Sequence, residues 1–201
     1  MKPNLFSSIA FISILVSAVL VIALHVLVPE YNPMTRAMSN YSNSRYGWMM
    51  VAAFLGFALS QFALVTAFRQ IALSKWQRFG VWLLAASGVC VLIAGIFPTD
   101  NTPDDTCVTT IGEIHAVAGH LLSPFMVGAM LGLSGKIDAT DSHREMQRAA
   151  FMIAVITAIM FIALVSVNSL GLQIGGIGQR IFIALVCAWL TLTSLRFTLP
   201  R

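Results

Sequence analysis

The chain has 201 residues, of which 58% are hydrophobic and only 10% are charged. A soluble domain carries about 25% charged residues because its surface faces water, so this composition excludes an ordinary soluble protein. The net charge of +4 does not indicate a nucleic-acid partner, because the basic residues are scattered among short segments and form no patch. We expect one membrane domain that occupies residues 1–201 and binds no nucleic acid.

Apolar runs of about 20 residues, the length that crosses the hydrocarbon core of a bilayer, recur along the whole chain. The first run is longer than the apolar region of a signal peptide, which has about 7–15 residues, so we interpret it as an uncleaved span. The sequence predicts an all-α, polytopic membrane protein with a bundle of six transmembrane helices. The predicted spans are 7–28, 48–68, 79–97, 112–133, 149–167 and 179–198.

The segments between the spans carry ordinary helix-ending signals. A Ser- and Asn-rich run over 39–44 belongs to the first loop, and Pro98 closes the third span because proline lacks an N–H and restricts its neighbour. The glycine-rich segment 168–178 lacks the spacing of a dinucleotide-binding loop. In the fourth span, Gly128 and Gly132 form a Gly-x-x-x-Gly pair. Such pairs allow two membrane helices to approach closely.

The distribution of basic residues predicts the orientation. Cytoplasmic segments are enriched in Lys and Arg, so we expect both termini in the cytoplasm and the protein in the cell membrane, which is the cytoplasmic membrane in a bacterium. The N-terminus, second loop, fourth loop and C-terminus together carry nine basic residues, against three in the other loops. The nine are Lys2, Arg69, Lys75, Arg78, Lys136, Arg144, Arg148, Arg196 and Arg201, and the three are Arg36, Arg45 and Arg180.

The stretch 96–115, on the predicted outer side, is the first candidate site. His115 stands at the start of a membrane helix, where it can act as a base or simply bond to a loop carbonyl. Asp100 can act as a base, bind a metal, orient His115 or cap a helix. We interpret the other acids of this stretch as a solvated rim. They are Asp104, Asp105 and Glu113.

Two arginines complete the candidate site. Arg45 and Arg180 each open a span from the outer side. A guanidinium at such a place can bind a phosphate or a carboxylate, pair with an acid, or reach the lipid headgroups. We expect Asp100 and His115 to be catalytic and Arg45 and Arg180 to bind substrate.

The remaining histidines give little sign of a cofactor. His120 follows His115 by five residues, about 140° around a helix, so the two do not form a paired metal site. His25 with His115 or His120 could clamp a haem between two helices, or each could merely be hydrogen-bonded. Because no metal-ligand spacing is present, we predict neither a metal nor another cofactor.

Four motifs follow one another along the chain, with Phe125 after the third. They are Ser42-Asn43-Ser44-Arg45-Tyr46-Gly47, Phe97-Pro98-Thr99-Asp100, Gly112-Glu113-Ile114-His115 and Gly178-Gln179-Arg180. In these motifs the chain resembles a large bacterial and archaeal family of six-span membrane proteins that is catalogued only as a domain of unknown function. The resemblance implies no activity. It implies that one recurring set of outer-side residues belongs together: Arg45, Asp100, His115 and Arg180.

Three functions are compatible with these residues. The first is an outer-leaflet polar pocket that binds, and in one version processes, a membrane lipid or other amphiphile, with Asp100 orienting His115 as a base. The second is a non-enzymatic scaffold or transporter-like protein in which the Asp, Arg and His contacts are structural. The third is a haem-carrying electron-transfer protein. The sequence leaves open whether the protein is an enzyme.

The orientation gives a testable prediction. Cys107 is the only cysteine in a predicted aqueous loop, whereas Cys90 and Cys187 lie inside apolar runs. A membrane-impermeant maleimide added to intact cells should label the wild type and not the Cys107→Ser variant. Labelling of Cys107 only after the cells are opened would invert the topology.

Overall fold

The computed structural model describes the chain except for residues 1–3, 72, 103–107, 136–140, 170–174 and 199–201. The predictions made for Asp104, Asp105 and Cys107 therefore lie outside the described residues.

Six long helices build the described part of the chain, which contains no strand. Each of the six is long and apolar enough to cross a membrane, which confirms the predicted all-α, six-span, multi-pass architecture. The helices are α1 (Leu5–Leu27), α2 (Gly47–Phe68), α3 (Lys75–Ile96), α4 (Thr110–Leu133), α5 (Asp141–Ser169) and α6 (Gly175–Thr198), and a short 3-10 helix, η1 (Met38–Asn43), precedes α2.

The helices extend beyond the predicted spans where their first turns are polar or glycine-rich. The start of α3 is fixed by a capping box, in which the Ser74 side chain accepts from the Gln77 N–H and the Gln77 side chain accepts from the Ser74 N–H. Such a box satisfies two N–H groups that the helix leaves unpaired. The predicted spans omit these turns because they were defined by apolar residues alone, and the first turns of the helices are not apolar.

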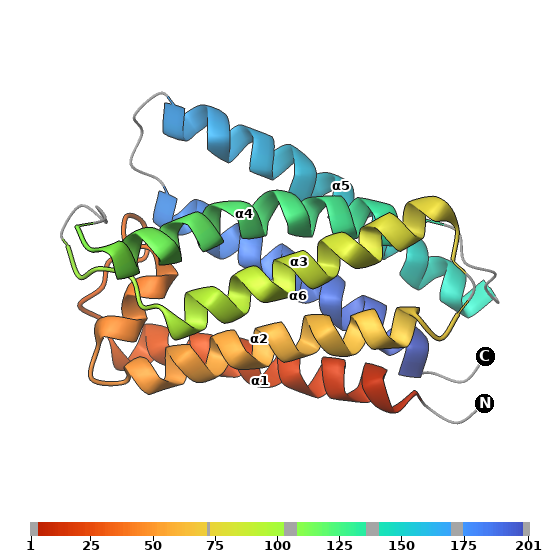
Figure 1. Cartoon of the computed structure of the whole chain (residues 1–201), viewed down its shortest axis with the longest axis horizontal. Helices are drawn as coiled ribbons and strands as arrows, with labels where there is room; N and C mark the ends of the chain where they lie inside the picture. The colour runs from red at the N-terminus through yellow and green to blue at the C-terminus, as the bar shows by residue number, and fades with distance from the viewer. Residues whose placement is uncertain (1–3, 72, 103–107, 136–140, 170–174, 199–201) are drawn as a thin grey trace.

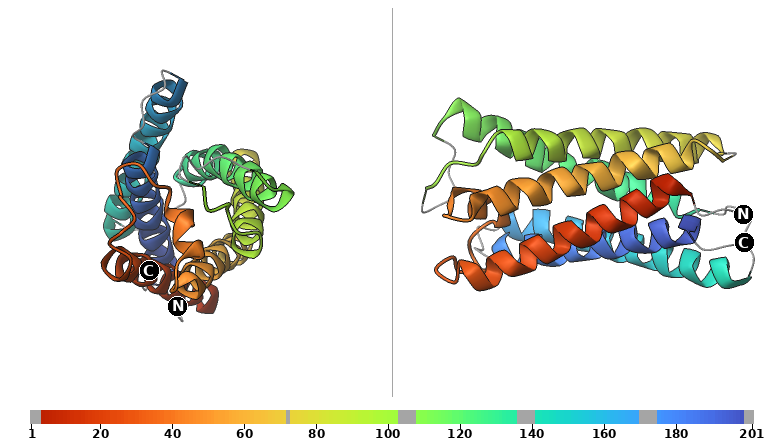
Figure 2. Two further views of the ribbon diagram at one scale, coloured as in Figure 1. Left: turned by 90° about the vertical axis from the view of Figure 1, so that its left-hand side faces the viewer. Right: turned by 90° about the horizontal axis from the view of Figure 1, so that it is seen from below.

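The helices form a ring in chain order, since each packs on the next and α6 returns to α1. Helix α1 begins and α6 ends at one end of the bundle, which we call the terminal end (Figure 1). The opposite end, where η1 lies, is the η1 end. Toward it α5 leans away from α4 (Figures 1 and 2).

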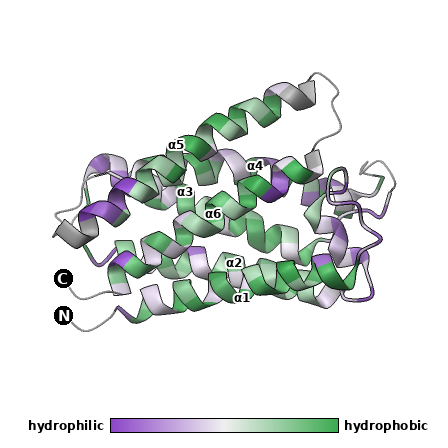
Figure 3. Cartoon of the chain, turned by 180° about the vertical axis from the view of Figure 1, so that it is seen from behind, coloured by the Kyte–Doolittle hydropathy of each residue, from purple (hydrophilic) through white to green (hydrophobic). Residues whose placement is uncertain are grey.

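Apolar residues cover the middle of the bundle, and polar residues gather at its two ends (Figure 3). Helix α5 is the least enclosed, with only 17% of its most apolar stretch buried. Large apolar side chains are exposed along this stretch, including Ile159 and Ile162. A soluble protein rarely leaves so continuous an apolar surface uncovered, so lipid is the expected neighbour of this surface.

Glycines bring α3 and α4 into backbone contact near the terminal end. A Cβ added at Gly132 would lie 3.1 Å from Cα of Gly80, and one added at Gly128 would lie 2.7 Å from a methyl carbon of Leu83. The close helix approach predicted from the Gly-x-x-x-Gly pair is thus confirmed. Beside it, Nε1 of Trp189 on α6 donates to Oγ of Ser134 at the end of α4, at 2.9 Å. The bundle is therefore tightly closed at the terminal end.

The contact between Gly80 and Gly132 predicts a loss of stability for Gly132→Ile. A branched side chain there must push the α3 backbone away, and overpacking of this kind costs about 1–3 kcal/mol. Thermal unfolding of the detergent-solubilised protein measures this loss. Gly119→Ala on the same helix is the control, because a Cβ there meets no atom within 4 Å. Equal melting of the two variants would contradict the packing.

Candidate functional site

A pocket of about 440 Å³ lies inside the ring toward the η1 end. Every long helix except α5 contributes to its wall, and η1 covers part of it. The volume is within the range of small-molecule sites, about 300–1,000 Å³. Most lining side chains are apolar, among them Met50, Phe54, Phe57, Leu122, Phe182 and Ile183.

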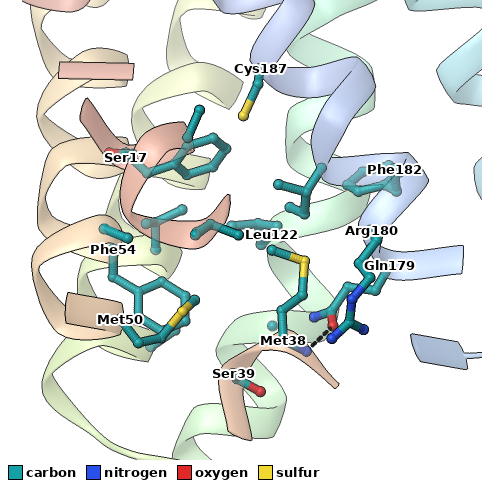
Figure 4. A pocket seen from close by; sticks show the side chains of 18 of the residues that line it. Ser17, Met38, Ser39, Met50, Phe54, Leu122, Gln179, Arg180, Phe182 and Cys187 are labelled. Carbon is teal, nitrogen blue, oxygen red and sulfur yellow. Dashed lines mark hydrogen bonds between the residues drawn. The ribbon is translucent and has the colours of Figure 1, made fainter. Parts of the chain in front are cut away.

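Several polar lining groups lie on η1 and near the η1 ends of α1, α4 and α6. Figure 4 shows Gln179 and Arg180 of α6 extending toward Met38 of η1. The N–H of Met38 donates to Oε1 of Gln179 at 2.7 Å. His25 and His115 also line the pocket. The site is therefore amphipathic, with an apolar cavity and a polar group of residues at its η1 end.

Arg180 joins four segments at this end. Its Nε donates to Nε2 of His25 on α1 at 2.8 Å. Its Nη1 donates to the main-chain oxygens of Arg36, at 2.7 Å, and Gly176, at 3.0 Å. Its Nη2 lies 3.4 Å from the hydroxyl of Tyr41 in η1. No carboxylate pairs with this guanidinium among the described residues.

The contacts of His25 determine its tautomer. Its Nδ1 lies 2.8 Å from the carbonyl oxygen of Val21, so Nδ1 carries the hydrogen and Nε2 accepts from Arg180. An imidazole engaged in this way has no nitrogen left for a haem iron. His120 is exposed, and its Nδ1 contacts the carbonyl oxygen of Ala116 at 2.6 Å. The haem hypothesis thus gains no support from the geometry of His25.

His115 is buried, with 8% of its surface exposed, although it lines the pocket. Its Nδ1 lies 2.8 Å from the carbonyl oxygen of Phe97 and 3.1 Å from that of Ala94, both at the end of α3. The ring also meets Phe54 edge-on, with 6.1 Å between centroids. Main-chain carbonyls, rather than a carboxylate, therefore orient this imidazole.

Asp100 does not contact His115, contrary to the expected base and orienting pair. Its carboxylate accepts from the N–H groups of Val108 and Thr109, at 2.8 and 3.0 Å, and from the Thr109 hydroxyl at 2.7 Å. The hydroxyl hydrogen bond of Thr109, followed by the two N–H groups, holds the pKa of Asp100 below its ordinary value. Local N–H groups that need an acceptor before α4 thus bind this carboxylate.

The position of Asp100 explains two motifs together. A Cβ at Gly112 would collide with the Asp100 carboxylate, so only glycine allows this approach. Thr109, which donates to Asp100, accepts from the Gly112 N–H and caps α4. His115 follows one turn later. The Phe-Pro-x-Asp and Gly-x-x-His motifs therefore form one structural unit that places His115 against the end of α3.

Arg45 does not join the pocket either. It is exposed, and its guanidinium carbon lies 4.7 Å from the ring centroid of the adjacent Tyr46. It therefore finds a local partner before α2 begins. Of the four residues predicted to converge, the structure brings only His115 and Arg180 to one pocket.

Two site features, Tyr41 and His25, were missed or misread in the sequence. Tyr41 belongs to a polar loop run, yet it is 1% exposed and faces Arg180. His25 was considered as a haem ligand or as a merely hydrogen-bonded residue, and its contact with Arg180 was not predicted. Gly119 shares one face of α4 with His115 and Ser123, and all three line the pocket. Gly119 is also exposed, and a Cβ there would meet open space. A lone aromatic side chain in a Ser- and Asn-rich segment was the available signal for Tyr41.

Metal binding finds no assembled ligand set in the described part of the chain. No three His, Cys, Asp or Glu side chains gather there in a metal-binding arrangement.

The cap formed by Asp100 predicts a pH-dependent loss of stability in Asp100→Asn. The lowered pKa means that the carboxylate stabilises the fold fully above about pH 3.9, its unfolded value, and that this contribution disappears as the pH falls through the lower folded value. The variant should melt below the wild type at pH 7, and the difference should shrink toward acid. Asn101→Ala, one residue along in an exposed position, is the control.

A second variant separates this cap from an ion pair. Asp100 and Arg180 share no contact, so Asp100→Asn and Arg180→Gln should lower the melting temperature additively. Recovery of stability in the double variant would contradict the cap.

No curated protein matches this chain, and no solved structure does. One family model, described as a protein of unknown function and designated DUF998, matches residues 11–196. The match includes all six helices, although it begins inside α1 and ends inside α6. The chain therefore belongs to the DUF998 family of proteins of unknown function.

Proposed function

We propose that this protein binds a membrane lipid or another amphiphile in the pocket at its η1 end. The observation that carries the proposal is the pocket itself, about 440 Å³ of largely apolar space with Arg180 and His115 at one end. An apolar chain placed in this space would be removed from water, while the head group would meet the polar residues. With the termini in the cytoplasm, this end belongs to the outer leaflet of the cell membrane.

The arrangement of the helices supports entry of an amphiphile into the pocket from the side of the bundle. Helices α4 and α6 are joined at the terminal end by Trp189 and Ser134. Toward the η1 end, both line the pocket instead. Gly119 on α4 is exposed and lines the pocket, with nothing within 4 Å of the place of a Cβ. An amphiphile could therefore pass from the bilayer beside Gly119 without first leaving the membrane.

Binding, rather than processing, is the function that we propose. A hydrolytic reaction would need a base with an orienting acid, or a nucleophile next to a base. Asp100 is engaged with Thr109 and Val108, so it does not orient His115. The general-base pair expected from the sequence is therefore not part of the proposal.

A structural scaffold is the second candidate, and the contacts of Arg180 favour it. This side chain holds α1, the first loop and η1 to α6. A partly buried arginine with such partners can serve packing alone. The two candidates differ in whether the cavity must stay open. Binding requires the open space beside Gly119, whereas a scaffold does not.

Filling the cavity tests the proposal. We expect Gly119→Trp to place an indole in the open space and to reduce the amount of co-purified amphiphile about tenfold, equivalent to about 1.4 kcal/mol. Native mass spectrometry of protein extracted in a mild neutral detergent measures the amount bound. Gly119→Ala should retain the wild-type amount.

A second control places the same bulk elsewhere. Ile159→Trp adds an indole to the lipid-facing surface of α5, where the side chain is 63% exposed, and should not change binding. An unchanged load in Gly119→Trp would contradict the proposed function and favour the scaffold.

A further inference from the structure

His115 offers an unused hydrogen-bond acceptor in the pocket. Its Nδ1 lies against the two carbonyl oxygens of Ala94 and Phe97. Carbonyl oxygens only accept, so Nδ1 must carry the hydrogen, and Nε2 of the neutral ring has a lone pair. Nε2 has no hydrogen-bond partner among the described residues, and His115, although only 8% of the residue is exposed, lines the pocket.

His25 and His115 have the same kind of partner at Nδ1 but differ at Nε2. Both histidines have Nδ1 on a carbonyl oxygen and therefore present Nε2 as an acceptor. In His25, Nε2 is occupied by Arg180. In His115, which lines the same pocket, the equivalent position is left for a ligand that can donate a hydrogen bond.

Arg180 supplies the complementary group. A guanidinium has five N–H donors. One goes to His25 and two go to the carbonyl oxygens of Arg36 and Gly176. Of the two on Nη2, the hydroxyl of Tyr41 takes at most one, at 3.4 Å. Within the described part of the chain, one Nη2 hydrogen remains without an acceptor, and the cation remains without an anion.

We propose that the amphiphile carries a hydroxyl beside an anionic group, as in a monoacylglycerol phosphate. The hydroxyl donates to Nε2 of His115, and the anion lies at Nη2 of Arg180. The acyl chain occupies the apolar part of the pocket. This inference rests on the proposed function and narrows its ligand from amphiphiles in general to hydroxylated anionic ones.

The test compares two ligands that differ in one hydroxyl. The first is dodecanoyl glycerol 3-phosphate, and the second is dodecanoyl propanediol phosphate, which has the same chain and phosphate but no free hydroxyl. A neutral hydrogen bond contributes about 0.5–1.5 kcal/mol. The wild type should therefore bind the first ligand about two- to tenfold more tightly, as measured by native mass spectrometry of the protein in a neutral detergent.

Variants then assign the preference to His115. In His115→Phe, which keeps a flat ring and lacks both nitrogens, the ratio of the two affinities should fall to about one. A ratio reports on the hydroxyl because a general loss of folded protein affects both ligands equally. Inorganic phosphate, added alone as a competitor, should displace neither ligand at matched concentration if the chain contributes to binding.

Each outcome decides a different claim. Equal binding of the two ligands by the wild type, or a preference that persists in His115→Phe, would overturn this inference. If Gly119→Trp still abolished binding, the proposed function would stand. If Gly119→Trp bound both ligands as the wild type does, the proposed function and the inference would fail together.

If His115→Phe fails to fold, the wild-type ratio alone still decides the hydroxyl preference. Displacement by phosphate alone would identify a small-anion site and would also overturn the inference.

Discussion

The hydrogen bonds of Arg180 are the constraint on which the η1 end depends. A charged side chain at membrane depth is costly unless it finds partners, and Arg180 meets this requirement with His25, Tyr41 and two main-chain oxygens. These contacts fix the first loop over the start of α6. Gly176 allows this arrangement, because a Cβ there would lie 2.7 Å from the oxygen of Arg36. The guanidinium of Arg180, together with the hydrogen bonds from Met38 to Gln179 and from Ile177 to Met34, therefore holds the first loop and η1 over the pocket.

The two ends of the bundle are packed differently. At the terminal end, glycines and the contact between Trp189 and Ser134 draw the helices together. At the η1 end, α5 leans away and the helices enclose a pocket instead (Figures 1 and 4). Close packing is the rule in protein interiors, and association in lipid depends on it. A cavity of this size beside a tightly closed region therefore calls for an occupant, which is the basis of the proposed function.

The sequence predicted the six spans and the close approach at Gly132, because both depend on local composition. Of the four residues proposed for the site, only His115 and Arg180 line the pocket. Asp100 and His115 were placed near each other by their spacing, yet the intervening backbone presents N–H groups that take the Asp100 carboxylate. The roles of His25 and Tyr41 depend on segments far apart in the chain, 155 and 139 residues from Arg180. Periodicity carries no information about such contacts. The open space beside Gly119 is likewise a property of the assembled ring.

Photo-crosslinking tests the central claim, that an amphiphile occupies the interior of the ring, most directly. A monoacylglycerol phosphate with a diazirine at the end of its chain would be irradiated with the protein in bilayers, and the modified peptides would be identified by mass spectrometry. We expect labelling of residues that line the pocket, such as Phe57, Leu122 and Ile183, and loss of this labelling in Gly119→Trp. Labelling confined to the lipid-facing side chains of α5, such as Ile159 and Ile162, would contradict the account.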